Sequence, residues 1–313
     1  MPNELKIFSG RANPRLAEAI CQHLGQSLNR LEVSRFSNDN LTVQIKENVR
    51  EKDVFVVQPF TAPVGDTVME LFIILDALRS ASAKRITAVI PYFSYARSDK
   101  KDAPRISITG RLMADLLKTA GSDRVLTMDL HSDAVHGFFS VPVDHLTAIP
   151  YFVEHFTSHI DLTHAVVVAT DAGGAKRAGR FAKRIRLPMA IIDKRRIADT
   201  EVEQGLVVGD VKGRDAIIFE DEISTGGTLA ASVKTLAGAG VRSIHVGATH
   251  GVLCGPAVDR LVDSAIASVV VTDTVHLPVE KRAHKIHVLS VAPLFAEAIR
   301  RIHTGESIGA LFD

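Results

Sequence analysis

The chain has 313 residues, of which 46% are hydrophobic, enough to bury substantial cores in about two domains. Its 37 basic and 36 acidic residues leave a net charge of +1, so we expect no general attraction to nucleic acid or to a membrane surface. Cys21 and Cys254, the two cysteines, provide neither a disulfide framework nor a zinc site. Without a signal-peptide core or an apolar run of about 18 residues, the chain is expected to be cytoplasmic.

Short β-branched segments alternate with helical patterns along the chain. The predicted strands are 54–58, 86–91, 124–129, 165–170, 189–193, 216–219, 243–249 and 268–272. Apolar residues at helical spacing predict helices at 68–78, 110–119 and 229–236. The alternation indicates the α/β class, with mostly parallel sheets flanked by helices. A break near residues 141–144 predicts two similar domains, 1–145 and 146–313, with a last helix at 292–302 that can pack back onto the first.

The segment 217–229, IIFEDEISTGGTL, is the most informative part of the sequence. An apolar strand delivers two acids, Glu220 and Asp221, and then breaks into a Gly-rich turn before a helix. Ligands of open α/β sheets bind at the carboxyl ends of the strands, and a Gly-rich turn that opens a helix offers N–H groups to a phosphate. The segment therefore predicts a sugar-phosphate site, with the acids facing the sugar hydroxyls.

A second strand, at 189–193, runs directly into three consecutive cations, Lys194, Arg195 and Arg196. A run of this kind is often only a solvated basic loop. Here a polar stretch at 197–204 follows, as in a mobile loop hinged at a strand end. Such a flap can close its cations over a polyphosphate while charge moves.

Other strand ends carry candidate metal and phosphate ligands. His131 follows the strand at 124–129, and Asp171 precedes a glycine pair after the strand at 165–170. A lone histidine after a strand is usually structural, but magnesium takes only one or two protein ligands, so a sparse pair suffices. Arg97 lies in PYFSYARSDKK, whose aromatic residues are equally typical of a core and whose cations suit a triphosphate. The chain has no Walker-type phosphate loop.

Seven stretches together resemble the ribose-phosphate diphosphokinase (phosphoribosyl-diphosphate synthase) family along nearly the whole chain. They are 35–50, 77–99, 123–139, 142–146, 189–196, 209–229 and 296–312. The resemblance implies two phosphoribosyltransferase-type α/β domains and a homo-oligomer of dimers within a hexamer. It implies an enzyme that transfers the diphosphoryl group of Mg-ATP to O1 of ribose 5-phosphate. It also implies magnesium as cofactor.

The same resemblance implies roles for individual residues. Lys194 and Arg196 would stabilise charge on the transferring group, and His131 and Asp171 would bind magnesium. The residues implied on the nucleotide side are Phe36, Asn38, Asn40, Arg97, Ser98 and His131, with the adenine contacts made from a neighbouring subunit. Those implied on the ribose 5-phosphate side are Asp171, Arg196, Glu220, Asp221, Ser224, Thr225, Gly226, Gly227 and Thr228.

The chain departs from the family pattern in two places. Where the family usually has Asp-Asp and a further acid, this chain has Glu220-Asp221 and Ser224, as in orotate-type phosphoribosyltransferases. Where the family usually has Asp-Gly-Glu, it has residues 38–40 as Asn-Asp-Asn, and Ser98 replaces a glutamine. Two alternatives therefore stand beside the diphosphokinase: a phosphoribosyltransferase that consumes the activated sugar, and a non-catalytic regulatory partner of a separate synthase.

Overall fold

The computed structural model describes residues 4–193, 196–198, 201–202, 205–262 and 264–311, and the chain divides into two compact units. The first unit comprises Met1–Thr147, Thr274–His276 and Ser290–Asp313, and the second comprises Ala148–Asp273 and Leu277–Leu289. The last 24 residues, Ser290–Asp313, which the sequence placed in the second domain, thus belong to the first unit. The α/β class is confirmed, and in the described part of the chain no helix is both long and apolar enough to cross a membrane.

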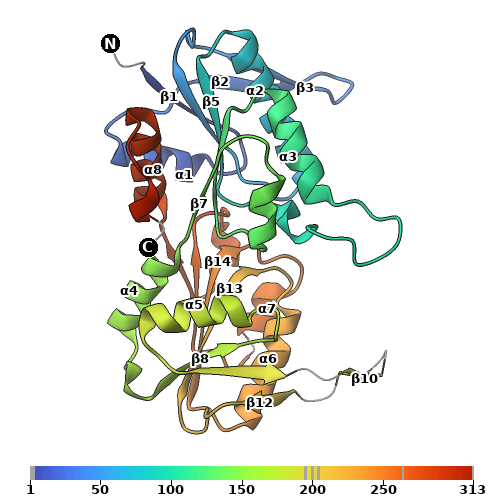
Figure 1. The fold of residues 1–313 in the computed structure, drawn as a ribbon, viewed down its shortest axis with the longest axis vertical. Helices are drawn as coiled ribbons and strands as arrows, with labels where there is room; N and C mark the ends of the chain where they lie inside the picture. Colours follow the sequence, from blue (N-terminus) through green and yellow to red (C-terminus); the bar gives the residue numbers. More distant parts are fainter. Residues whose placement is uncertain (1–3, 194–195, 199–200, 203–204, 263, 312–313) are drawn as a thin grey trace. The chain divides into compact units, whose positions relative to one another are not determined.

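The first unit is built on a sheet of five parallel strands in the order β1-β4-β5-β6-β7, of which Figure 1 labels β1, β5 and β7. Their bounds are Leu5–Ser9, Asp53–Val57, Arg85–Ile90, Arg124–Met128 and Val143–Leu146. Strand β4 is buried at every position, as expected for a parallel strand covered on both faces. Strand β7 pairs with β6, and this segment of the first unit runs to Thr147, where the sequence analysis placed the domain boundary at residue 145.

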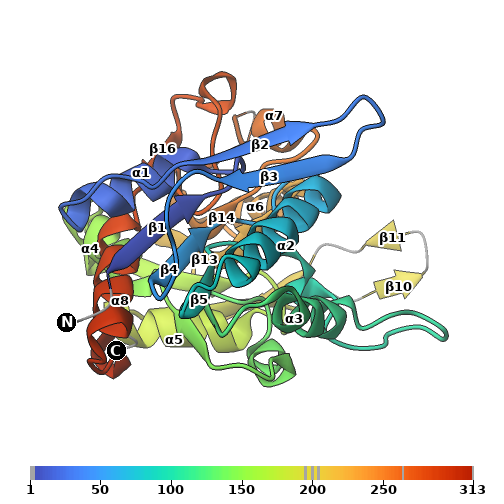
Figure 2. The ribbon, with the colours of Figure 1, turned by 90° about the horizontal axis from the view of Figure 1, so that it is seen from above.

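Four helices accompany this sheet, namely α1 (Pro14–His23), α2 (Val64–Ser80), α3 (Thr109–Ala120) and α8 (Ala292–Thr304). Helix α1 begins at Asn13, whose side chain accepts a hydrogen bond from the Leu16 N–H, and α3 ends at Gly121 with φ +117°, a left-handed cap that favours glycine. Helices α2 and α3 contact each other, as do α1 and α8 (Figure 2). Short 3-10 turns lie at Ser94–Arg97 (η1), Asp133–Phe138 (η2) and Gly309–Leu311 (η5).

Polar contacts explain why α8 joins the first unit. The Asp53 carboxylate, 4% exposed, receives the Arg85 guanidinium and lies 2.7 Å from Nδ1 of His303 on α8. Arg85 also donates to the backbone oxygen of Ile302 at 2.8 Å. A buried carboxylate is costly unless it is paired, so the cation and the histidine fix the end of α8 against the start of β4.

The second unit contains a sheet of seven strands in the order β12-β9-β8-β13-β14-β15-β16. All neighbours are parallel except β12 and β9. In the order of the sheet, the bounds are Leu206–Val208, Met189–Asp193, Ala165–Ala169, Asp215–Ile223, Ser243–Gly251, Ser268–Thr272 and Ile286–Leu289. Two short antiparallel strands, β10 (Arg196–Ala198) and β11 (Glu201–Val202), pair with each other.

Helices cover both faces of this second sheet. On one face, Phe219 of β13 packs against Phe152 of α4 and Phe181 of α5. On the other face, Ile218 shares a buried cluster with Leu229 of α6. The helices are α4 (Ile149–His159), α5 (Ala175–Ile185), α6 (Gly227–Gly238) and α7 (Ala257–Val262), with 3-10 turns at Leu162–His164 (η3) and Val279–Lys281 (η4).

Candidate functional site

The carboxyl ends of β8 and β13 lie side by side in the second unit. The two strands pair in parallel from Ala165 opposite Asp215 to Val168 opposite Ile218. Thr170 and Asp171 follow the end of β8, and Glu220 and Asp221 lie near the end of β13, beyond the part paired with β8. Because parallel strands end at the same edge, the segment predicted from the sequence meets the loop that carries Asp171.

Glu220 is held by two neighbours at this edge. Its Oε1 accepts a hydrogen bond from the Thr170 hydroxyl at 2.5 Å, and its Oε2 accepts one from Nη1 of Arg177 at 2.8 Å. The same Arg177 nitrogen lies 3.0 Å from Oδ1 of Asp221. Burial raises the pKa of Glu220, as do the charges of Asp221 and Asp171, while the Thr170 hydrogen bond and the Arg177 charge oppose that rise. The site therefore concentrates negative charge around one arginine.

The predicted phosphate loop, residues 224–228, comprises the turn after β13 and the first two residues of α6. Gly226, the N-cap of α6, has φ +70° and no side chain that could accept a hydrogen bond from the helix. The cap residue therefore leaves the N–H groups of the first helical turn to another acceptor. Such a helix end suits an anion. Two hydrogen bonds hold the backbone of the loop. The Cys254 N–H donates to the backbone oxygen of Ser224 at 3.1 Å, and Nη1 of Arg260 donates to the backbone oxygen of Thr225 at 2.9 Å.

Asp171 is oriented by the glycine pair that follows it. Its Oδ1 accepts a hydrogen bond from the Gly174 N–H at 2.8 Å. A Cβ at Gly173 would lie only 3.2 Å from the same oxygen, so the pair leaves room for the carboxylate. In the described ranges, no three His, Cys, Asp or Glu side chains are grouped as a metal site, so any magnesium here would depend on sparse protein ligands.

The cationic flap is only partly described. Strand β9 ends at Asp193, directly before Lys194. Lys194 lies outside the described residues, and Arg196 is described only as the first residue of β10. Their roles remain the predictions made from the sequence.

In the first unit, the residues predicted to contact the nucleotide base lie in the turn of a hairpin. The hairpin is formed by β2 (Leu31–Arg35) and β3 (Leu41–Ile45). The Phe36 N–H donates to the Asn40 oxygen at 3.0 Å, and Asn38 Oδ1 accepts from the Asn40 N–H at 3.3 Å. The Phe36 side chain is 60% exposed. The turn thus exposes the Phe36 ring to solvent, and the side-chain oxygen of Asn38 accepts a hydrogen bond from the backbone of the same turn.

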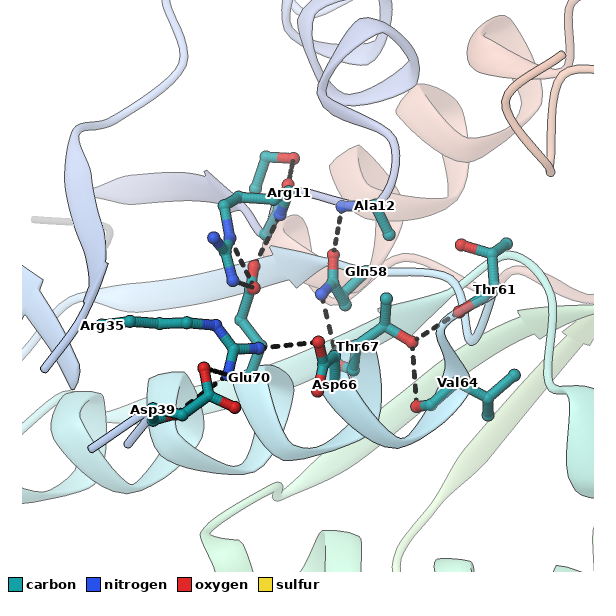
Figure 3. A network of polar contacts seen from close by, with 12 residues as sticks. Arg11, Ala12, Arg35, Asp39, Gln58, Thr61, Val64, Asp66, Thr67 and Glu70 are labelled. Atoms are coloured by element: carbon teal, nitrogen blue, oxygen red, sulfur yellow. Dashed lines mark hydrogen bonds and ion pairs between the residues drawn. The ribbon is translucent and has the colours of Figure 1, made fainter. Parts of the chain in front are cut away.

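An arginine fixes this turn to helix α2, as Figure 3 shows. Arg35 donates from Nη1 to Oδ1 of Asp39 at 2.8 Å and from Nη2 to Oδ2 of Asp66 on α2 at 2.6 Å. One helical turn further, the buried Glu70 accepts from the Arg11 N–H and side chain at 2.6 and 2.8 Å. Helix α2 therefore holds the hairpin turn through Asp66 and the segment that follows β1 through Glu70.

The remaining predicted residues of the first unit follow β5 and β6. Exposed Arg97 ends η1, and the Ser98 backbone joins η1 to α3 by accepting from the Gly110 N–H at 3.1 Å. Tyr92 and Phe93 of the same segment are buried, so these aromatics belong to the core, as one of the two sequence interpretations held. His131 is exposed beyond the end of β6.

Sequence reasoning did not find the residues that orient the site. Thr170, Arg177 and Arg260 contact the predicted residues, yet each is 35 to 50 positions from its partner. Cys254, whose Sγ lies 3.2 Å from the Ser224 hydroxyl, was considered only for disulfides and zinc. The one available signal was the position of Arg177 shortly after Asp171 and its glycine pair.

Known proteins match the chain over nearly its whole length. A model of the N-terminal domain of ribose phosphate pyrophosphokinase matches residues 5–121, and a model of the phosphoribosyl synthetase-associated domain matches residues 196–313. The ribose-phosphate pyrophosphokinase of Deinococcus radiodurans is 52% identical over 98% of both chains. That of Caldanaerobacter subterraneus is 49% identical over 99% of this chain and 98% of its own.

A solved structure agrees with these matches. The crystal structure of phosphoribosylpyrophosphate synthetase from Mycobacterium smegmatis superposes with a TM-score of 0.93 at 40% identity, covering 97% of this chain and 100% of its own. Identity at this level over the full length does not arise from a shared fold alone. The chain belongs to the ribose-phosphate pyrophosphokinase family.

Proposed function

We propose that the protein transfers the diphosphoryl group of Mg-ATP to O1 of D-ribose 5-phosphate, giving 5-phosphoribose 1-diphosphate and AMP for nucleotide biosynthesis. The observation that carries the proposal is the edge of the second sheet, where Glu220 and Asp221 meet the phosphate loop at the start of α6. Membership of the family supports the same reaction.

In this reaction O1 of the sugar attacks the β-phosphorus of ATP and loses its proton. The bond between the β-phosphorus and the oxygen that bridges to the α-phosphorus breaks, and AMP leaves. Such an in-line transfer requires mainly positioning and cations near the developing charge. We assign the sugar phosphate to Ser224, Thr225, Gly226, Gly227 and Thr228, and the ribose hydroxyls to the two acids of β13.

The charge of the transferring group is assigned to Lys194 and Arg196, as catalytic residues of the flap that follows β9. Arg196 is also assigned to ribose 5-phosphate. On the nucleotide side we assign the base to Phe36, Asn38 and Asn40, and the phosphates to Arg97 and Ser98. The exposed ring of Phe36 and the exposed Arg97 support these assignments, because a base needs a stacking surface and a triphosphate needs a cation.

We assign His131 and Asp171 as magnesium ligands, as predicted from the sequence. The carboxylate of Asp171, oriented by the Gly174 N–H, is a hard oxygen donor of the kind that magnesium prefers. When bound, the ion neutralises charge on the phosphate oxygens. We further propose that the protein is cytoplasmic and forms a homo-oligomer of dimers within a hexamer. Light scattering of the purified protein measures the mass of the oligomer.

The reaction is tested by its products. Purified protein with ribose 5-phosphate, ATP and Mg²⁺ is expected to release AMP in step with an acid-labile diphosphate ester. An ATP analogue with a methylene group between the α- and β-phosphorus is the control, because its scissile bond is blocked, and it should release no AMP. ADP as the nucleotide product would contradict the proposal, since it reports transfer of the γ-phosphoryl group alone.

The same assay separates the two alternatives. A regulatory partner without catalytic activity forms no AMP on its own. A phosphoribosyltransferase leaves ATP intact but consumes the activated sugar when a nucleobase is supplied.

A further inference from the structure

Two acids at the edge of the second sheet share a cation. Glu220 and Asp221 lie near the end of β13, and Asp171 follows the end of β8. Burial, and then the charges of Asp221 and Asp171, raise the pKa of Glu220. Arg177 of α5 forms ion pairs with Glu220 and Asp221 at 2.8 and 3.0 Å. Like charges this close repel, so the arrangement of the acids depends on the cation between them.

These ion pairs are largely removed from solvent. The exposed fractions of the side chains are 17% for Arg177, 18% for Glu220 and 7% for Asp221. Truncating one member of a buried ion pair leaves the other charges uncompensated, which is strongly unfavourable. The contact is therefore much more consequential than an ion pair on the surface.

The position of Arg177 in its helix also indicates that its contacts to the acids matter. It lies near the start of α5, whose first turn contains no acidic residue. The amino end of a helix disfavours cations because of the helix dipole. Since the helix dipole gives no reason for a cation here, the contacts of Arg177 to the two acids are the feature that accounts for its position.

We propose that Arg177 is a positioning residue for the ribose-binding acids, which rests on the proposed function. Its Nη1 contacts Oε2 of Glu220 and Oδ1 of Asp221, while Thr170 holds the other oxygen of Glu220. The acids are thereby oriented before the sugar binds. Each carboxylate oxygen accepts more than one hydrogen bond, so both acids still receive ribose hydroxyls. Arg177 acts through them and needs no contact with the sugar.

Calorimetric titration of the full chain with ribose 5-phosphate tests the role of Arg177. Arg177→Met, which keeps the stem and removes the charge, is expected to weaken binding about 10- to 100-fold. In the kinetic assay KM for ribose 5-phosphate should rise while KM for ATP stays within about twofold. Arg177→Lys keeps the charge without the planar fork and should recover part of the affinity. Lys183→Met, an exposed cation on the same helix, is the matched control.

The outcomes are distinct. Absence of ribose 5-phosphate binding and of AMP formation in the wild-type chain refutes the proposed function. If the wild type binds ribose 5-phosphate and Arg177→Met binds it with the same affinity, the role of Arg177 is overturned. This holds even if the melting temperature of the variant falls. An equal rise of both KM values overturns it as well. If Arg177→Met does not fold, Arg177→Lys decides: about 3- to 10-fold weaker binding supports the role, and unchanged affinity overturns it.

Discussion

Replacing Gly226 with alanine is expected to destabilise the protein by about 1 kcal/mol and to weaken ribose 5-phosphate binding. Gly226 has φ +70°, and an added Cβ would lie 3.7 Å from the Cα of Ala257, an ordinary van der Waals distance. The penalty is therefore conformational: about 1–2 kcal/mol for a non-glycine residue in the left-handed region. The lower entropy of the unfolded alanine chain offsets about 0.4–1 kcal/mol of it, which leaves about 1 kcal/mol.

Urea unfolding followed by circular dichroism measures this change, and Gly238→Ala at the other end of α6 is the matched control. Gly238 has no atom within 4 Å of an added Cβ, and its φ lies outside the left-handed region. The same substitution should therefore stabilise the protein by about 0.5–1 kcal/mol. Two results would refute the reasoning: a Gly226→Ala variant as stable as the wild type with the same KM, or a loss of several kcal/mol, which would indicate a clash with Ala257.

Three further predictions concern the flap, the hairpin turn and the cysteines. Lys194→Ala should lower kcat about 100- to 1,000-fold with little change in ribose 5-phosphate affinity; a change in KM alone would contradict its role in the transition state. Asn38→Asp combined with Asn40→Glu should alter the ranking of ATP, GTP and CTP in kcat/KM, and an unchanged ranking would remove both from base recognition. Iodoacetamide should label partly exposed Cys254 but not Cys21, because burial raises the pKa of the Cys21 thiol to about 11; mass spectrometry showing two adducts would contradict this.

The sequence predicted those strands that lie buried between layers of helices. Strands β4 and β8 are buried at every position and therefore read as continuous apolar segments, whose predicted bounds were within one residue of those observed. Strands β3 and β16 were missed because they are partly exposed and carry polar residues. Helix α5 was not among the predicted helices although its buried residues Ala178, Phe181, Ala182 and Ile185 stand at helical spacing, because two of the four are alanines and cations occupy most of the remaining positions.

Long-range contacts decide where the last helix packs. The last helix, α8, is amphipathic. Its sequence pattern identifies the apolar face of the helix but does not identify the unit against which that face packs. Its partner is decided by Asp53 and Arg85, which pair with His303 and the Ile302 backbone over more than 200 residues. No local pattern encodes such a contact, so the sequence analysis ran the second domain to residue 313 and stated only that the last helix can pack onto the first domain.

Glu220 and Ser224, the two residues of the ribose-phosphate segment that depart from the family pattern, each contact neighbouring side chains in the structure. Glu220, which stands where the family usually has aspartate, uses both carboxylate oxygens on Thr170 and Arg177, so its length is accommodated by its neighbours. Ser224, which stands where the family usually has an acid, meets the Cys254 thiol at 3.2 Å. The phosphate loop therefore carries one negative charge fewer. Because a phosphate dianion is repelled by a neighbouring carboxylate, we expect this substitution to favour binding of the 5-phosphate at the proposed site, while the acids proposed to face the sugar are kept.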